Sequence, residues 1–130
     1  MTKQWYQEHG YKMSNYIEDA EITRAEALVR DAYITPIVGS VTIPEEVLNN
    51  TLAELAFLYL LQQSVFLTRS GAKIKTGYNS QQADTWDLLQ QSAMTCHLAL
   101  VGLRKQPGVN ATAEVTDICK IYFKTNFFNL

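Results

Sequence analysis

Cysteine is scarce in this sequence. The chain of 130 residues contains two, Cys96 and Cys119, and no Cys-x-x-Cys pair. A disulfide scaffold needs a denser set of cysteines in a short chain. We therefore interpret both as reduced, small core residues, with a single disulfide as the alternative.

Charge is also low. Asp, Glu, Lys and Arg make up 18% of the chain and the net charge is −2, whereas typical soluble domains carry about 25% charged residues. A general nucleic-acid-binding protein is normally strongly basic, so this composition argues against that class. Apolar residues reach 47%. That share is enough to build one core, and it excludes intrinsic disorder as the main state.

Signals for secretion or membrane insertion are missing. The first ten residues hold no apolar segment of the kind found in secretory signal peptides. The longest apolar run, from Leu55 to Leu61, is far shorter than the roughly 20 residues that span a bilayer. We therefore expect a soluble chain, made in a cytoplasm, with no membrane partner.

Motifs for catalysis are absent as well. The sequence contains no phosphate-binding loop, dinucleotide fingerprint, His-Glu-x-x-His or Gly-x-Ser-x-Gly. His9 and His97 are far apart in the chain, and the neighbours Cys96 and His97 point about 100° apart on a helix, which is poor geometry for a shared site. We predict no catalytic residue, no cofactor and no metal site, and the chain is not expected to be an enzyme.

What the sequence does contain is helical periodicity. Apolar residues recur at three- and four-residue spacing in four stretches, at 16–33, 42–67, 81–105 and 115–123. Pro36 and Gly39 are expected to end the first helix. The second begins at Thr42-Ile43-Pro44-Glu45, where Thr42 and Glu45 match a capping box and Pro44 suits the first turn.

The second of these helices is unusual because it is apolar nearly all round between Leu55 and Leu61. Such a helix is buried on most sides. The burial comes either from its own bundle or from another subunit.

Three segments fall outside these helices. Residues 1–16 form an aromatic arm without periodicity, predicted to be irregular and to pack on the body or on a neighbour. Residues 69–79 break the helical period between two glycines and predict an exposed loop or small β-tongue. Residues 124–130 form an apolar tail, and we assign its Phe127, Phe128 and Leu130 to a subunit interface.

Together these patterns predict the fold class. We expect a single domain over 1–130, an all-α small bundle of about four helices. Two long antiparallel helices dominate it, with a short loop or β-tongue between them.

The predicted tongue is basic although the protein is slightly acidic. No Asp or Glu occurs from Leu55 to Ala83, whereas Arg69, Lys73 and Lys75 all lie there. The segment is either a solvated loop or a contact for a polyanion or for the acidic face of a partner.

Paired glutamines on the helices, such as Gln62-Gln63 and Gln90-Gln91, suit burial against other proteins because amides cost less to desolvate than ions. A compositional preference of the source organism is the alternative reading of these amides.

The order of these elements resembles a known family. The stretch from Asp31 to Gly39 (DAYITPIVG), the Ile43-Pro44-Glu45-Glu46-Val47 start, the long apolar helix, the tongue from Gly71 to Gly77 and the second long helix resemble the head–tail connector (head-completion adaptor) proteins of long-tailed bacteriophages and prophages. The likeness covers roughly residues 17–105.

Several expectations follow from that resemblance. The chain would be a virion structural protein, made in the host cytoplasm, that forms a homo-oligomeric ring beneath the portal and extends the DNA channel. Its partners would be other copies of itself, portal and tail proteins, and double-stranded DNA held non-specifically. The tongue around Lys73 and Lys75 would project toward DNA or the next subunit.

Two other hypotheses stay open on the residues alone. One is a small helical interaction module or dimeric regulator, which predicts a discrete dimer without rings. The other is an enzyme with a sparse site, which predicts a concave pocket holding His97 or Cys96 with a strongly shifted pKa.

Overall fold

All the regular secondary structure in the described part of the chain is helical, as the periodicity predicts. The computed structural model describes the backbone of residues 1–72 and 78–118 and the side chains of residues 1–62 and 88–118. Its elements are α1 (Lys3–Glu8), α2 (Asp19–Val29), the π-helical turn η1 (Arg30–Ile34), α3 (Thr35–Val38), α4 (Glu45–Ala72) and α5 (Tyr78–Leu103). The prediction of a small all-α bundle is confirmed.

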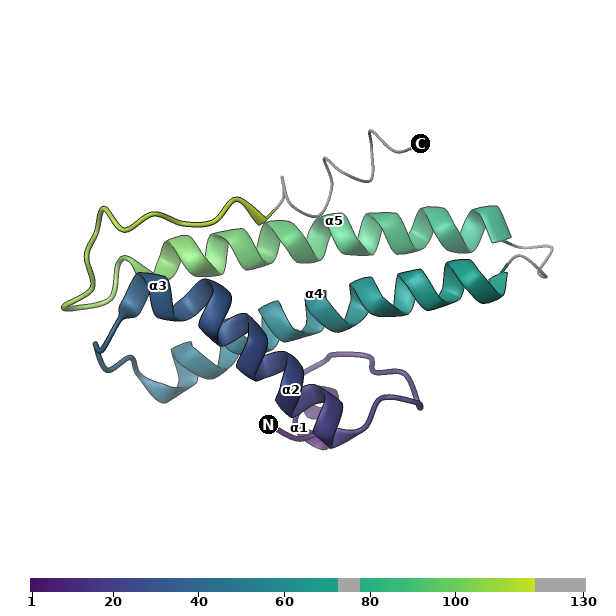
Figure 1. Cartoon of the computed structure of the whole chain (residues 1–130), viewed down its shortest axis with the longest axis horizontal. Helices are drawn as coiled ribbons and strands as arrows, with labels where there is room; N and C mark the ends of the chain where they lie inside the picture. Colours follow the sequence, from purple (N-terminus) through teal and green to yellow (C-terminus); the bar gives the residue numbers. More distant parts are fainter. Residues whose placement is uncertain (73–77, 119–130) are drawn as a thin grey trace.

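The two long helices α4 and α5 lie side by side and run antiparallel (Figure 1). One side of α5 forms a buried seam, whose residues recur at the three- and four-residue spacing that places apolar side chains on one helix face. These residues are Leu89, Ala93, Cys96, Leu100 and Leu103. The hairpin of α4 and α5 is therefore the frame on which the remaining elements pack.

The middle of α4 is buried within its own chain. Leu55 and Leu58 are each 1% exposed and Ala56 is fully buried. The helix α2 crosses α4 in Figure 1 and packs against it through Ile22, Ala25 and Val29. Contact with α2 and α5 accounts for the buried residues of this stretch. Its Phe57, Tyr59 and Leu61 are only partly buried.

The sequence predicts that Pro36 and Gly39 end the helix that begins at Asp19. The helix does not stop at Pro36 and ends only at Gly39. The chain stays helical through η1 and α3 as far as Val38. In η1 the amide of Thr35 donates to the carbonyl of Arg30, five residues back. A proline inside an α-helix clashes with the carbonyl four residues earlier, and the wider π turn changes that spacing just before Pro36. Gly39, with φ 57°, ends the helix in a conformation that favours glycine.

The connection between α4 and α5 is shorter than predicted. The helix α4 extends to Ala72 and α5 begins at Tyr78, so both ends of the predicted 69–79 tongue are helical. A glycine near a helix end, such as Gly71, costs only about 1 kcal/mol, and packing of two long helices readily offsets that cost. Lys73 and Lys75 lie outside the described residues.

The two ends of the chain also differ from the predictions. The N-terminal arm is not wholly irregular, because α1 forms where the Thr2 hydroxyl caps the helix by accepting from the Trp5 amide at 3.1 Å. After α5 the chain turns at Gly108 and residues 113–117 are not helical. The prediction of a helix that begins at Val115 is therefore wrong. The remainder of that predicted helix and the 124–130 tail lie outside the described residues.

Candidate functional site

The outward face of α5 carries exposed apolar side chains. Leu88, Met94 and Leu98 are 43%, 54% and 67% exposed. Leu98 lies two residues beyond the buried Cys96, which places it on the opposite side of the helix. A surface helix of a globular protein normally turns polar residues to this side. The apolar residues of α5 are therefore not confined to its buried seam.

The rest of this face is uncharged. No Asp, Glu, Lys or Arg occurs from Leu88 to Leu103. The exposed polar residues there include Gln91 and Thr95, and the Thr95 hydroxyl donates to the Gln91 carbonyl at 3.0 Å. Covering this face would remove no ionic group from water, so the main desolvation cost of association is avoided. We call the exposed residues Leu88, Gln91, Met94, Thr95 and Leu98 the α5 outer face.

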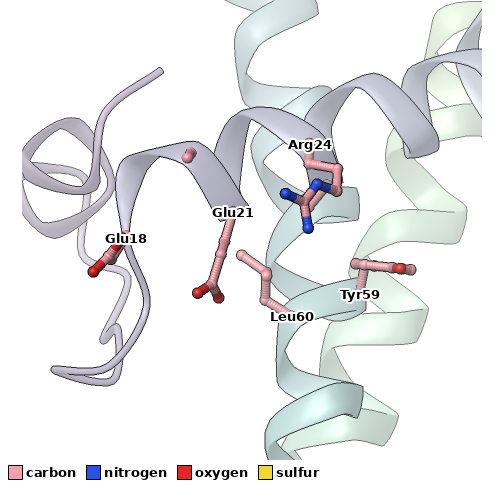
Figure 2. A pocket seen from close by; sticks show the side chains of 7 residues that line it. Glu18, Glu21, Arg24, Tyr59 and Leu60 are labelled. Carbon is pink, nitrogen blue, oxygen red and sulfur yellow. The ribbon is translucent and has the colours of Figure 1, made fainter.

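A cleft of about 340 Å³ lies between the N-terminal part of α2 and the middle of α4 (Figure 2). Glu18 and Glu21 lie toward the start of α2, while Arg24 lies nearer Tyr59. Carboxylates at a helix N-terminus interact favourably with the positive end of the helix dipole. The cleft thus combines charges of both signs with an apolar floor. Its lining residues are Glu18, Ala20, Glu21, Arg24, Ala25, Tyr59 and Leu60.

Two tyrosines, the buried Tyr6 and the partly buried Tyr11, hold the N-terminal arm on the bundle. The Tyr6 hydroxyl donates to Glu26 Oε2 at 2.8 Å, and the Met1 ammonium contacts Glu26 Oε1 at 2.7 Å. The Tyr11 hydroxyl donates to Glu54 Oε1 at 2.6 Å. The arm therefore packs on its own chain, which decides between the two positions left open by its sequence.

Burial raises the pKa of Tyr6 far above its ordinary value, and the hydrogen bond to Glu26 adds to the rise. Burial and the hydrogen bond to Glu54 raise the pKa of Tyr11 in the same way. Both hydroxyls are therefore held as neutral donors to a carboxylate. This arrangement serves to position the arm, since neither tyrosine is among the residues that line the cleft.

The residues considered for a sparse enzyme site do not line either cavity described for this chain. Cys96 is fully buried on α5, and the half-buried His97 follows it. A second cavity, of about 280 Å³, lies where α3 leads into α4 and is lined by residues such as Arg30, Val38 and Leu48. Within the described residues, no group of three or more His, Cys, Asp and Glu side chains is placed to hold a metal ion.

The side chains of the site residues singled out from sequence all lie outside the described set, so their arrangement stays a prediction. Arg69 belongs to α4, but its side chain is outside the described set, as are Lys73, Lys75, Phe127, Phe128 and Leu130. The predictions made from the sequence did not include the α5 outer face. The signal for it was available in the sequence as the long stretch without charge after Asp87.

No helix in the described portion of the chain has the length and apolar character needed to cross a bilayer. Neither a protein-family model, nor a curated protein, nor a solved structure matches the chain.

Proposed function

We propose that this chain is a structural subunit of a phage virion, a head–tail connector protein that forms a ring under the portal and extends the DNA channel. The observation that carries the proposal is the uncharged α5 outer face with its exposed Leu88, Met94 and Leu98. A ring subunit needs a surface that associates with another copy without burying ions, and this face meets that need.

The shape of the bundle supports the same proposal. The uncharged stretch from Leu88 to Leu103 is about 24 Å long at 1.5 Å per residue. That length suits packing against another helix, where axes approach to about 8–10 Å. Contacts that repeat from one subunit to the next close into a ring when the rotation between neighbours permits it.

The basic end of the α4–α5 hairpin has a separate role in the proposal. Arg69, Lys73 and Lys75 would face channel DNA or the next subunit. Three positive charges from one subunit give weak, salt-sensitive attraction to phosphates, and a ring multiplies that attraction. The DNA contact is therefore non-specific, and no catalytic step or cofactor is proposed for this chain.

The test is the oligomeric state of the full chain, measured by native mass spectrometry over a concentration series with negative-stain images of the large species. Closed rings are expected. Leu98→Glu should abolish them, because it places a charge in the centre of the α5 outer face. Leu28→Glu is the matched control. Leu28 is also an exposed helical leucine, 48% accessible, but it lies on α2.

Two outcomes contradict the proposal. A stable dimer that never grows would favour the small helical interaction module instead. A chain that stays monomeric at every concentration, and still binds no purified portal ring, would exclude the connector role.

A further inference from the structure

The turn before α2 presents one aromatic side chain to solvent. Tyr16 is 90% exposed, more than any other large apolar residue in the described part of the chain. The backbone of this turn is held, since the Tyr16 amide donates to Ser14 Oγ at 3.2 Å and the Ile17 amide donates to the Ser14 carbonyl at 3.2 Å. Met13 and Ile17, on either side of the turn, pack against the core. The turn is thus anchored on both sides, while the tyrosine ring between the anchors stays in water.

The cavity of about 280 Å³ where α3 leads into α4, here called the α3–α4 cavity, has the chemistry to receive such a ring. Its apolar wall includes Ile34, Val38, Ile43 and Leu48, and Arg30 is the one charged residue among the described residues that line it. Within the described side chains no carboxylate pairs with Arg30. A guanidinium donates to a hydroxyl oxygen and stacks on an aromatic face, so an apolar wall with one arginine suits a phenol. The volume is just below the range of about 300–1,000 Å³ typical of small-molecule sites, so it suits a single side chain better than a drug-sized ligand.

Tyr16 cannot fill this cavity in its own chain. The turn precedes α2, whereas the lining of the cavity begins at Arg30, directly after α2, so the two lie at opposite ends of that helix (Figure 1). The 11 residues of α2 are about 16 Å long, which is more than a tyrosine side chain spans. The exposed ring and the α3–α4 cavity can therefore meet only between two copies of the chain.

We propose that Tyr16 of one copy inserts into the α3–α4 cavity of the next, with its ring against the apolar wall and its hydroxyl toward Arg30. The contact joins different patches of the two copies, so it is head-to-tail and can repeat from subunit to subunit. The α5 outer face gives no such direction, because two copies that packed this face on itself around a two-fold axis would stop at a dimer. Tyr16 therefore supplies the polarity that a ring needs. The ring rests on the function proposed above, whereas the contact between two copies does not.

Cross-linking between two differently labelled copies tests the contact directly. One full-length variant carries Asn15→Cys, next to Tyr16, and the other carries Thr35→Cys at an exposed residue that lines the cavity. Both also carry Cys119→Ser, while the native Cys96 is fully buried. The two proteins are mixed with a short bismaleimide, and peptide mass spectrometry identifies the linked residues. We expect a link between positions 15 and 35. Each protein holds only one of these two cysteines, so the link joins two copies.

Matched variants show whether the ring of Tyr16 makes this link. Tyr16→Ser in the Asn15→Cys protein should lower the cross-linking yield about tenfold, since it removes the aromatic anchor. Tyr16→Phe keeps the ring and should leave the yield within about twofold. Thr23→Cys in place of Thr35→Cys puts the second thiol at an exposed threonine of α2 that does not line the cavity, and it should give only background linking. Equal yields with and without Tyr16→Ser, or equal yields at positions 35 and 23, would overturn the proposal.

Ring assembly is measured separately from the contact. In native mass spectrometry over a concentration series, the Tyr16→Ser chain should need about tenfold more protein than the wild type to form rings. If the link forms and depends on Tyr16 but no closed ring appears, the contact stands and the connector function fails. If rings form equally well with Tyr16→Ser and the link stays at background, the function stands and the contact is refuted. A chain that neither links nor forms rings refutes both.

Discussion

The N-terminal arm and the α5 outer face are both rich in large apolar side chains, yet the arm packs on the bundle and the α5 outer face is exposed. Tyr6 is fully buried, whereas Leu98 is 67% exposed. The arm has polar partners on the bundle, since Glu26 and Glu54 accept hydrogen bonds from its tyrosine hydroxyls. The α5 face offers no charged or buried acceptor of this kind. Apolar composition makes a segment able to pack, but directional hydrogen bonds decide where it packs.

The largest effect expected from this contrast comes from truncating the buried arm residue. Tyr6→Ala should lower the free energy of unfolding by about 3–5 kcal/mol, because it leaves a cavity and removes a donor from Glu26. Tyr16→Ala, in the same arm but at a residue 90% exposed, should change it by no more than about 0.5 kcal/mol. Urea unfolding followed by circular dichroism measures both. Equal losses would mean that the arm does not dock as described.

A second, smaller effect is a loss of stability at alkaline pH. Tyr6 and Tyr11 have raised pKa values in the folded chain. Above about pH 10 the unfolded chain releases these protons while the folded chain keeps them. The unfolded state then binds fewer protons, so stability falls as pH rises, by at most about 1.4 kcal/mol per pH unit for each tyrosine.

Thermal unfolding between pH 9 and pH 11.5 measures this slope. Tyr6→Phe and Tyr11→Phe should each flatten it, since phenylalanine has no proton to release. Leu98→Gln adds no titrating group and should leave the slope as in the wild type. A slope unchanged in both phenylalanine variants would show that the hydroxyls are not held as described.

The smallest effect on stability should come from the α5 outer face itself. Leu98→Gln should change the free energy of unfolding of the monomer by no more than about 0.5 kcal/mol, because the side chain is mostly exposed. Leu100→Ala, on the buried side of the same helix, should cost about 2–5 kcal/mol. A large loss for Leu98→Gln at high dilution would mean that this side chain is not exposed in the monomer as described.

Much of the fold could be predicted from the sequence because the long helices follow local rules. The three- and four-residue spacing predicted a helix over 81–105, and α5 runs from Tyr78 to Leu103. Pro44 marked the helix start correctly to within a residue, since α4 begins at Glu45 and the Pro44 carbonyl accepts from the Leu48 amide at 3.0 Å.

The errors lie where tertiary contacts or unusual backbone geometry decide the outcome. A proline normally ends a helix, and only the π turn before Pro36 lets this one continue. The short α1 has no apolar period of its own and is held by Tyr6 on Glu26, a partner twenty residues away in the chain. No local pattern reveals such a pairing. The α5 outer face does not follow from the sequence alone, because only the packing of the bundle shows that Leu88, Met94 and Leu98 lie on the exposed side of α5.

The π turn has a consequence for how this protein can change over generations. Arg30, Asp31 and Ala32 are exposed, so substituting one of them removes no buried side chain. The number of residues in η1, by contrast, is constrained. Removing one residue from η1 would restore ordinary α-helical winding and rotate everything after it by about 100° relative to α2. Ile34 and Ile37 would then leave the core they now fill. Deleting one residue from η1 is therefore expected to damage the fold more than substituting one.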